Sequence, residues 1–61
     1  MESHFEAGRT HLALAELAHV QDDRDSVAAQ LRAAHGLFTA LRVPKYVERT
    51  ARLAAQLDVA L

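Results

Sequence analysis

Apolar side chains recur at helical spacing in the middle of the chain. They fall at spacings of 4, 3, 4 and 3 residues in the set Val27, Leu31, Ala34, Phe38 and Leu41. This spacing places all of them on one face of an α-helix. The pattern therefore predicts a helix over about residues 25–41 that buries this face.

The segment before it carries a wider apolar surface. Ser3 and Glu6 form the S-x-x-E sequence of a capping box, in which the hydroxyl and the carboxylate satisfy backbone donors at a helix start. We therefore expect a helix over about residues 4–20. Its apolar positions are Phe5, Leu12, Leu14, Ala15, Leu17, Ala18 and Val20. They cover more of the helix than a one-sided surface helix needs, so this helix should have neighbours on two sides.

A third helix follows a proline. Pro44 cannot continue the second helix, but proline is favoured at the first position of a new one. This predicts a helix over about residues 44–58, with the apolar positions Val47, Ala51, Leu53, Ala54 and Leu57. The polar segment 21–24 separates the first two helices and supplies an Asp N-cap for the second. Gly36 lies inside the second helix and marks either a close helix crossing or a tolerated surface position.

The helical stripes predict an arrangement and a core. We expect the first and third helices to pack on opposite sides or ends of the second. The most buried side chains should include Leu14, Leu17, Leu31, Ala34, Phe38, Ala51 and Leu53.

Composition agrees with an all-α fold in one domain, residues 1–61. The chain holds 13 Ala and 9 Leu, the strongest apolar helix formers, and it has no Cys. A domain of this size buries only about 60% of the surface of its unfolded chain. Because no disulfide supplements such a core, we expect self-association to contribute to stability.

The charge balance argues against nucleic-acid binding. The net charge is −1, so the chain lacks a global basic field. A small nucleic-acid-associated regulator remains the weakest option, because the second and third helices concentrate bases: Arg32, Arg42, Lys45, Arg49 and Arg52. Residues 1–25 sum to −4 and residues 26–61 to +3. This asymmetry either orients copies head-to-tail or antiparallel, or reflects solvated helix faces.

Other function classes lack their signals. No apolar run is long enough to span a membrane and no signal-peptide pattern opens the chain, so we expect a cytoplasmic protein. His4 and His11 lie two helical turns apart, roughly 10 Å, which is too far to chelate one ion. His19 and His35 are more distant still, so we expect no metal. Without a Gly-rich phosphate loop or a Cys nucleophile, we expect no cofactor, no catalytic residue and no enzyme activity.

The chain contains an internal repeat. Arg9-Thr10, Ala15 and Leu17 recur 40 residues later as Arg49-Thr50, Ala55 and Leu57, and Glu16 corresponds to Gln56. The third helix therefore reads as a second copy of the first. This predicts a helix-turn-helix unit followed by the first helix of the next unit.

With these features the chain resembles tetratricopeptide repeats of the longer-period, Ala/Leu-rich kind found in large bacterial regulators. On the family's pattern, Leu14 and Ala15 match the helix A leucine and its small neighbour, and Leu31 and Ala34 match a large and a small position of helix B. The departures are His11 and Ala18 in place of aromatic residues and Val27 in place of a small one.

The resemblance implies a non-catalytic scaffold for protein–protein interaction, with an α-solenoid fragment of about one and a half repeats. Its first helices would line a concave face that binds a protein or peptide. The family's groove positions fall on Arg9, Leu12, Glu16 and His19, and on Arg49, Arg52, Gln56 and Val59. Arg9 and Arg49 would together hold an acidic peptide or a chain-terminal carboxylate, or else both would simply be solvated.

Two hypotheses remain. The first is an interaction module with a separate protein ligand, either by itself or within a larger regulator. The second is a structural helical unit whose partner is another copy of itself. One and a half repeats leave faces uncovered at both ends, so we expect a homo-oligomer.

Overall fold

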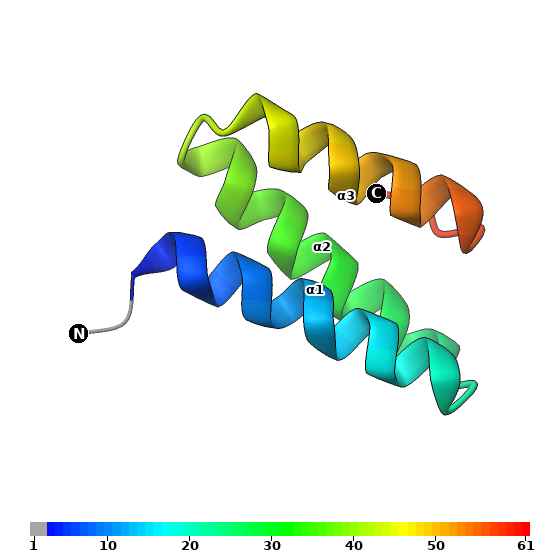
Figure 1. Ribbon diagram of the computed structural model, residues 1–61. Helices are drawn as coiled ribbons and strands as arrows, with labels where there is room; N and C mark the ends of the chain where they lie inside the picture. The colour runs from blue at the N-terminus through cyan, green and yellow to red at the C-terminus, as the bar shows by residue number, and fades with distance from the viewer. Residues whose placement is uncertain (1–2) are drawn as a thin grey trace.

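The computed structural model describes residues 3–61 as three helices (Figure 1). They are α1 (His4–Val20), α2 (Arg24–Ala40) and α3 (Pro44–Gln56). Neighbouring helices run antiparallel, and α2 lies between α1 and α3 (Figure 1). The all-α fold is therefore confirmed. Glu2, which contributes to the charge of the first half, lies outside the described residues.

The helix starts follow from local side-chain chemistry. The backbone N–H of Glu6 donates to Ser3 Oγ at 3.1 Å, so Ser3 is the N-cap of α1. Asp23 caps α2: its carboxylate accepts the backbone N–H of Ser26 at 3.3 Å and the Ser26 hydroxyl at 2.8 Å. Pro44 is the first residue of α3, as its sequence position predicts.

All three helices end in the same way, and none of them uses glycine. The residue after each C-cap has a positive φ: 58° at Asp22, 55° at Arg42 and 59° at Asp58. In each case the next backbone N–H reaches back across the last turn, as from Val43 to the Phe38 carbonyl at 3.1 Å. This is the Schellman motif. It ends α3 at Gln56, two residues before the predicted end.

The core is centred on α2. Leu31, Ala34 and Phe38 are completely buried, as their stripe predicts. The whole buried apolar set is Leu12, Ala15, Ala18, Val27, Leu31, Ala34, Phe38 and Ala54. All but the last come from α1 and α2, so these two helices form the main packed pair and α3 closes one side of it.

Gly8 is the point of closest approach between α1 and α2. A Cβ built on Gly8 would lie 2.7 Å from Phe38 Cε1, closer than real carbon atoms come. Only a residue without a side chain admits the Phe38 ring here. Gly36 has nothing within 4 Å of its Cβ direction and is exposed, so of its two interpretations the tolerated surface position is correct.

An aromatic cluster joins all three helices at one end. The Phe5 and Tyr46 rings lie 5.1 Å apart in an edge-to-face contact. The Phe38 ring lies 5.9 Å from Phe5 and 5.0 Å from Tyr46. Since Phe5 belongs to α1 and Tyr46 to α3, these outer helices meet above α2 at this end.

Three residues of the predicted core are exposed instead. Leu14 is 39% exposed and Leu17 53% exposed; Ala51 is exposed, and Leu53 is only half-buried. Leu41, the last member of the α2 stripe, is 38% exposed. The error on α1 has a physical cause. This helix is apolar on several sides, and it turns its small residues toward α2 because they allow the helices to approach closely.

A threonine takes the place of the expected alanine and leucine on α3. Thr50 is completely buried, and its hydroxyl donates to the Tyr46 carbonyl at 2.8 Å. That bond satisfies the polar group inside its own helix, so burial leaves no unpaired donor. The buried residues of α3 are therefore Thr50 and Ala54.

Candidate functional site

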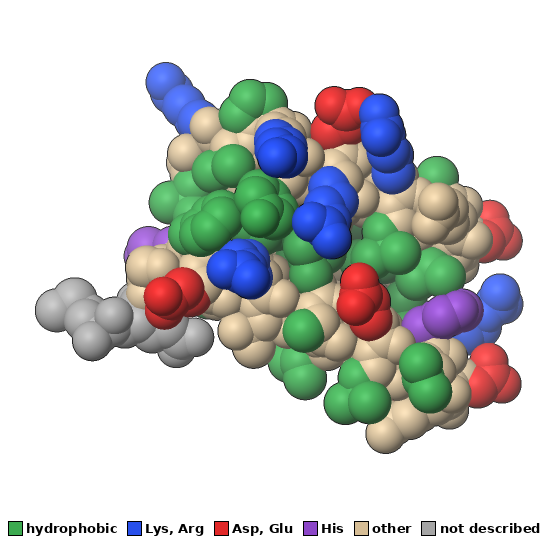
Figure 2. Space-filling view, in the orientation of Figure 1, with side chains coloured by type: hydrophobic (Ala, Val, Ile, Leu, Met, Phe, Trp, Pro, Cys, Tyr) green, Lys and Arg blue, Asp and Glu red, His purple; other side chains and the backbone are tan. Residues whose placement is uncertain are grey.

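A surface groove of about 710 Å³ runs between α1 and α3. From α1 it is lined by Arg9, Leu12, Ala13 and Glu16. From α3 it is lined by Lys45, Tyr46, Glu48, Arg49, Arg52, Leu53 and Gln56. Figure 2 looks onto this face, where cationic side chains gather beside apolar ones between the two helices. We call this site the α1–α3 groove.

Most of the residues predicted to face a ligand lie together in this groove. It brings together Arg9, Leu12, Glu16, Arg49, Arg52 and Gln56. Their meeting follows from the fold: α3 begins 40 residues after α1, so positions equivalent in the repeat lie at similar heights on the two helices. The sequence repeat and the groove therefore select the same positions.

His19 and Val59 lie elsewhere. Both line a second cavity, near the turn that joins α1 to α2. His19 follows Leu12 by two helical turns and is on the same side of α1, but at its level α3 has ended. The segment 57–60 faces His19 instead, so the groove does not extend to this end of the molecule.

Four groove residues were not predicted from the sequence: Ala13, Lys45, Tyr46 and Leu53. Lys45 and Tyr46 directly follow Pro44, and their counterparts 40 residues earlier are Phe5 and Glu6. Because these pairs differ in type, the repeat does not reveal them. The available signal was an aromatic residue in the first turn of α3, next to a lysine.

The groove is more basic than the chain as a whole. Its lining holds four cationic residues and two carboxylates, in a chain whose net charge is −1. One carboxylate is already engaged, because Glu48 pairs with Arg52 one helical turn away. The guanidinium of Arg49 lies 5.9 Å from the centre of the Tyr46 ring, within the range of a cation–π contact.

Two groove cations face open solvent. For Arg9 and Lys45, no carboxylate of residues 3–61 comes within 4.0 Å. Both side chains are exposed, and the apolar surface of Leu12 lies beside them in the same groove. An arrangement of this kind suits a ligand that carries carboxylates along one side and an apolar group along the other.

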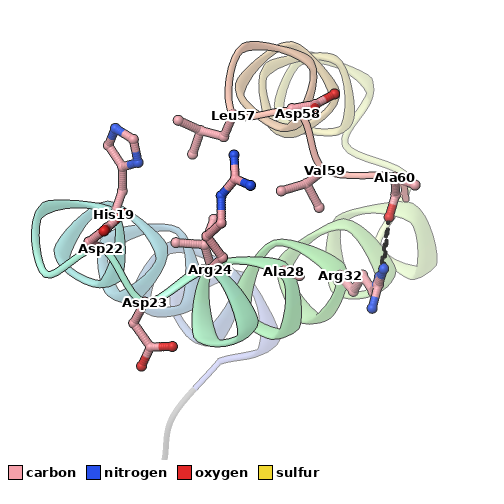
Figure 3. Close-up of a pocket in the computed structure, with 11 residues that line it drawn as sticks. His19, Asp22, Asp23, Arg24, Ala28, Arg32, Leu57, Asp58, Val59 and Ala60 are labelled. Carbon is pink, nitrogen blue, oxygen red and sulfur yellow. Dashed lines mark hydrogen bonds between the residues drawn. The ribbon is translucent and has the colours of Figure 1, made fainter.

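The second cavity, of about 310 Å³, is lined by the α1–α2 turn, the start of α2 and the segment after α3 (Figure 3). Arg32 donates from Nε and Nη2 to the Ala60 carbonyl, each at 3.2 Å. These bonds tie the segment after α3 to α2. The Arg24 side chain extends into the space below Leu57 (Figure 3).

The histidines do not gather into a cluster. Within the part of the chain that the structure describes, no group of three His, Cys, Asp or Glu side chains is placed to hold a metal ion. His11 Nδ1 donates to the Gln30 side chain, which gives this residue a role in joining α1 to α2. In the same residues, no helix combines the length and the apolar character needed to cross a membrane.

The groove's own geometry is therefore the basis for assigning a function. Its residues come from two helices that belong to equivalent positions of a repeat, and its charges are placed for contact with another molecule. Comparison with protein-family models, with curated proteins and with solved structures gave no match to this chain.

Proposed function

We propose that this chain is a non-catalytic protein-interaction scaffold of the tetratricopeptide kind, and that its α1–α3 groove binds an acidic segment of a partner protein. One observation carries the proposal. Arg9 and Arg49, which are equivalent in the 40-residue repeat, line the same groove from opposite sides.

The packing supports a repeated helix-turn-helix unit. The three positions matched to small or large residues of the family pattern and found in the core, Ala15, Leu31 and Ala34, are completely buried. The helices begin at residues 4, 24 and 44, so each helix and its turn occupy 20 residues. A regular period of this kind is expected when equivalent units stack.

The groove's chemistry supports an acidic ligand. Guanidinium groups bind carboxylates through paired hydrogen bonds, and Arg9 and Arg49 can each contact a different acidic residue. Leu12, Tyr46 and Leu53 supply apolar surface between them. Since these charges are exposed, they accelerate association and select orientation more than they add affinity. Binding should therefore weaken as salt concentration rises.

Charge reversal tests this proposal. A fluorescein-labelled peptide with alternating Glu and Leu residues is titrated with the whole chain, and binding is followed by fluorescence anisotropy. Arg9→Glu with Arg49→Glu should weaken binding more than tenfold, because two attractive contacts become repulsive. Both side chains are exposed, so the helix content measured by circular dichroism should stay unchanged.

The matched control reverses two exposed arginines outside the groove, Arg24→Glu with Arg42→Glu. It changes the net charge by the same amount. If the control weakens the peptide as much as the groove variant does, the effect is one of overall charge. In that case, or if the groove variant binds normally, the proposal is wrong.

A second candidate is a self-assembling helical unit without a separate ligand. The carboxylates Asp22, Asp23 and Asp58 line the second cavity at one end of the molecule, and the groove presents cations elsewhere on the same chain. The acidic end of one copy could therefore occupy the groove of the next. Sedimentation of the wild-type chain tests this candidate.

A further inference from the structure

One side of α1 is apolar and has no covering element. It consists of Ala7, Thr10, Leu14 and Leu17, which are spaced at 3, 4 and 3 residues and therefore share one side of the helix. We call this set the α1 stripe. All of its members except the half-buried Ala7 are exposed.

The same positions are covered in the second repeat. Forty residues after the α1 stripe, α3 carries Val47, Thr50, Ala54 and Leu57. Of these, Thr50 and Ala54 are buried, while Val47 and Leu57 are half-buried against the core. The helix that α3 packs on is α2. One face of the repeat is thus covered by a preceding helix in α3 and by nothing in α1.

The opposite comparison shows that α3 does not offer an equivalent opening. On α1 the residues that pack against α2 include Gly8, Leu12 and Ala15. Their counterparts on α3 are Glu48, Arg52 and Ala55, all of them exposed. Glu48 and Arg52 form an ion pair across this face. A charged outer face is typical of the helix that ends a stack.

We propose that the α1 stripe binds one amphipathic helix of a partner protein, which lies antiparallel to α1 and has the apolar spacing of α2. The stripe continues, one repeat earlier, the interface that α2 and α3 already form. The partner helix would present large apolar residues with the spacing of Val27, Leu31 and Phe38 and a small residue at the position of Ala34.

This surface is separate from the α1–α3 groove. Groove residues such as Arg9, Ala13 and Glu16 lie on a different side of α1 from the stripe. The inference therefore goes beyond the proposed function and does not rest on it. Because the two surfaces do not overlap, a partner helix and an acidic segment can bind at the same time.

A peptide with the sequence of α2 provides the probe. Residues 24–41 are synthesised with a hydrocarbon staple between positions 29 and 36, which are exposed in α2, so that the free peptide is already helical. The labelled peptide is titrated with the whole chain and followed by fluorescence anisotropy. Saturable binding is expected. Leu14→Glu and Leu17→Glu should each weaken it at least tenfold, because each places a charge in an apolar contact.

Two controls isolate the stripe. Val20→Glu changes an apolar residue that is 82% exposed and lies off the stripe, and it should leave binding unchanged. The groove variant Arg9→Glu with Arg49→Glu should also bind the α2 peptide normally. Circular dichroism of the Leu14 and Leu17 variants establishes that they fold, as expected for side chains outside the core.

Three results would overturn the proposal. The first is the absence of saturable binding. The second is binding that Leu14→Glu and Leu17→Glu leave intact, because the peptide would then have exchanged with the chain's own α2. The third is a wild-type dimer that these two variants convert to monomers, because a second copy would then cover the stripe.

Discussion

At the scale of single residues, the two glycines have opposite roles. Phe38 fills the space where a side chain at Gly8 would lie, while Gly36 faces open solvent. A glycine in a helix costs stability in either place through the entropy of the unfolded chain. Only at Gly8 is that cost offset by the packing of a large aromatic ring.

Alanine substitutions at the two glycines should therefore change stability in opposite directions. Gly8→Ala forces the Phe38 ring to move and should cost about 1–3 kcal/mol, as overpacked core positions do. Gly36→Ala meets no neighbour and should stabilise the chain by about 0.5–1 kcal/mol. Urea unfolding of both variants measures the difference. A stabilising effect at both positions would contradict the close contact between Gly8 and Phe38.

Arg42 shows a different local constraint. It is the residue after the C-cap of α2 and has a φ of 55°. This left-handed conformation brings Cβ close to the backbone and disfavours long side chains, whereas Asp, found at the other two helix ends, tolerates it better. Glycine has no such cost. The turn between α2 and α3 therefore carries avoidable strain.

Arg42→Gly should raise the free energy of unfolding by about 0.5–1 kcal/mol, because it relieves the left-handed strain. The matched control is Ala40→Gly, which lies two residues earlier within α2 and should lower stability by about 0.5–1 kcal/mol. Thermal unfolding followed by circular dichroism measures both. Destabilisation by Arg42→Gly would show that the Arg42 side chain makes a contact that outweighs the strain.

At the scale of elements, the three helices differ in how well their sequences predict packing. In α2, one narrow stripe is apolar, and four of its five members are buried. In α1, apolar residues occur on several sides, and the pattern alone does not select one. Close approach to α2 favours the side with Gly8, Ala15 and Ala18. The larger Leu14 and Leu17 then point away from α2.

The segment after α3 is positioned by contacts that no local pattern predicts. Val59 packs against the core, and its backbone N–H donates to the Ala54 carbonyl at 2.8 Å. Arg32 of α2 holds the Ala60 carbonyl through two hydrogen bonds. This segment closes the end of the molecule where the groove stops, and it explains why His19 lies outside the groove.

At the scale of the whole molecule, the charges are separated in space. Asp22, Asp23 and Asp58 lie at one end, and Arg9, Lys45 and Arg49 lie in the groove. A net charge of −1 leaves little overall repulsion between copies. Complementary ends favour head-to-tail contact between molecules.

Self-association therefore stays a prediction, and the structure suggests its form. Sedimentation equilibrium at micromolar concentration should give a mass above that of the monomer in low salt, and the mass should fall as salt screens the charges. Arg9→Glu with Arg49→Glu should reduce the association. A folded monomer at every salt concentration would contradict the prediction.

The sequence by itself determined the three helices and the residues that line most of the groove. Ser3, Asp23 and Pro44 act through local geometry, so the helix starts could be predicted from neighbouring residues. The 40-residue repeat identified Arg9 and Arg49 as equivalent positions. Equivalent positions come together when units of equal length stack, and for this reason the groove could be anticipated without coordinates.

Only the tertiary structure decided which side of α1 is buried, which glycine admits an aromatic ring and which end of the repeat stays open. These features depend on residues distant in sequence, such as the pair Gly8 and Phe38. A helix that is apolar on several sides can bury any of them, and the choice depends on how closely its neighbour can approach. Thr50 is buried for the same reason, since its position on α3 faces α2 and its hydroxyl is satisfied within its own helix.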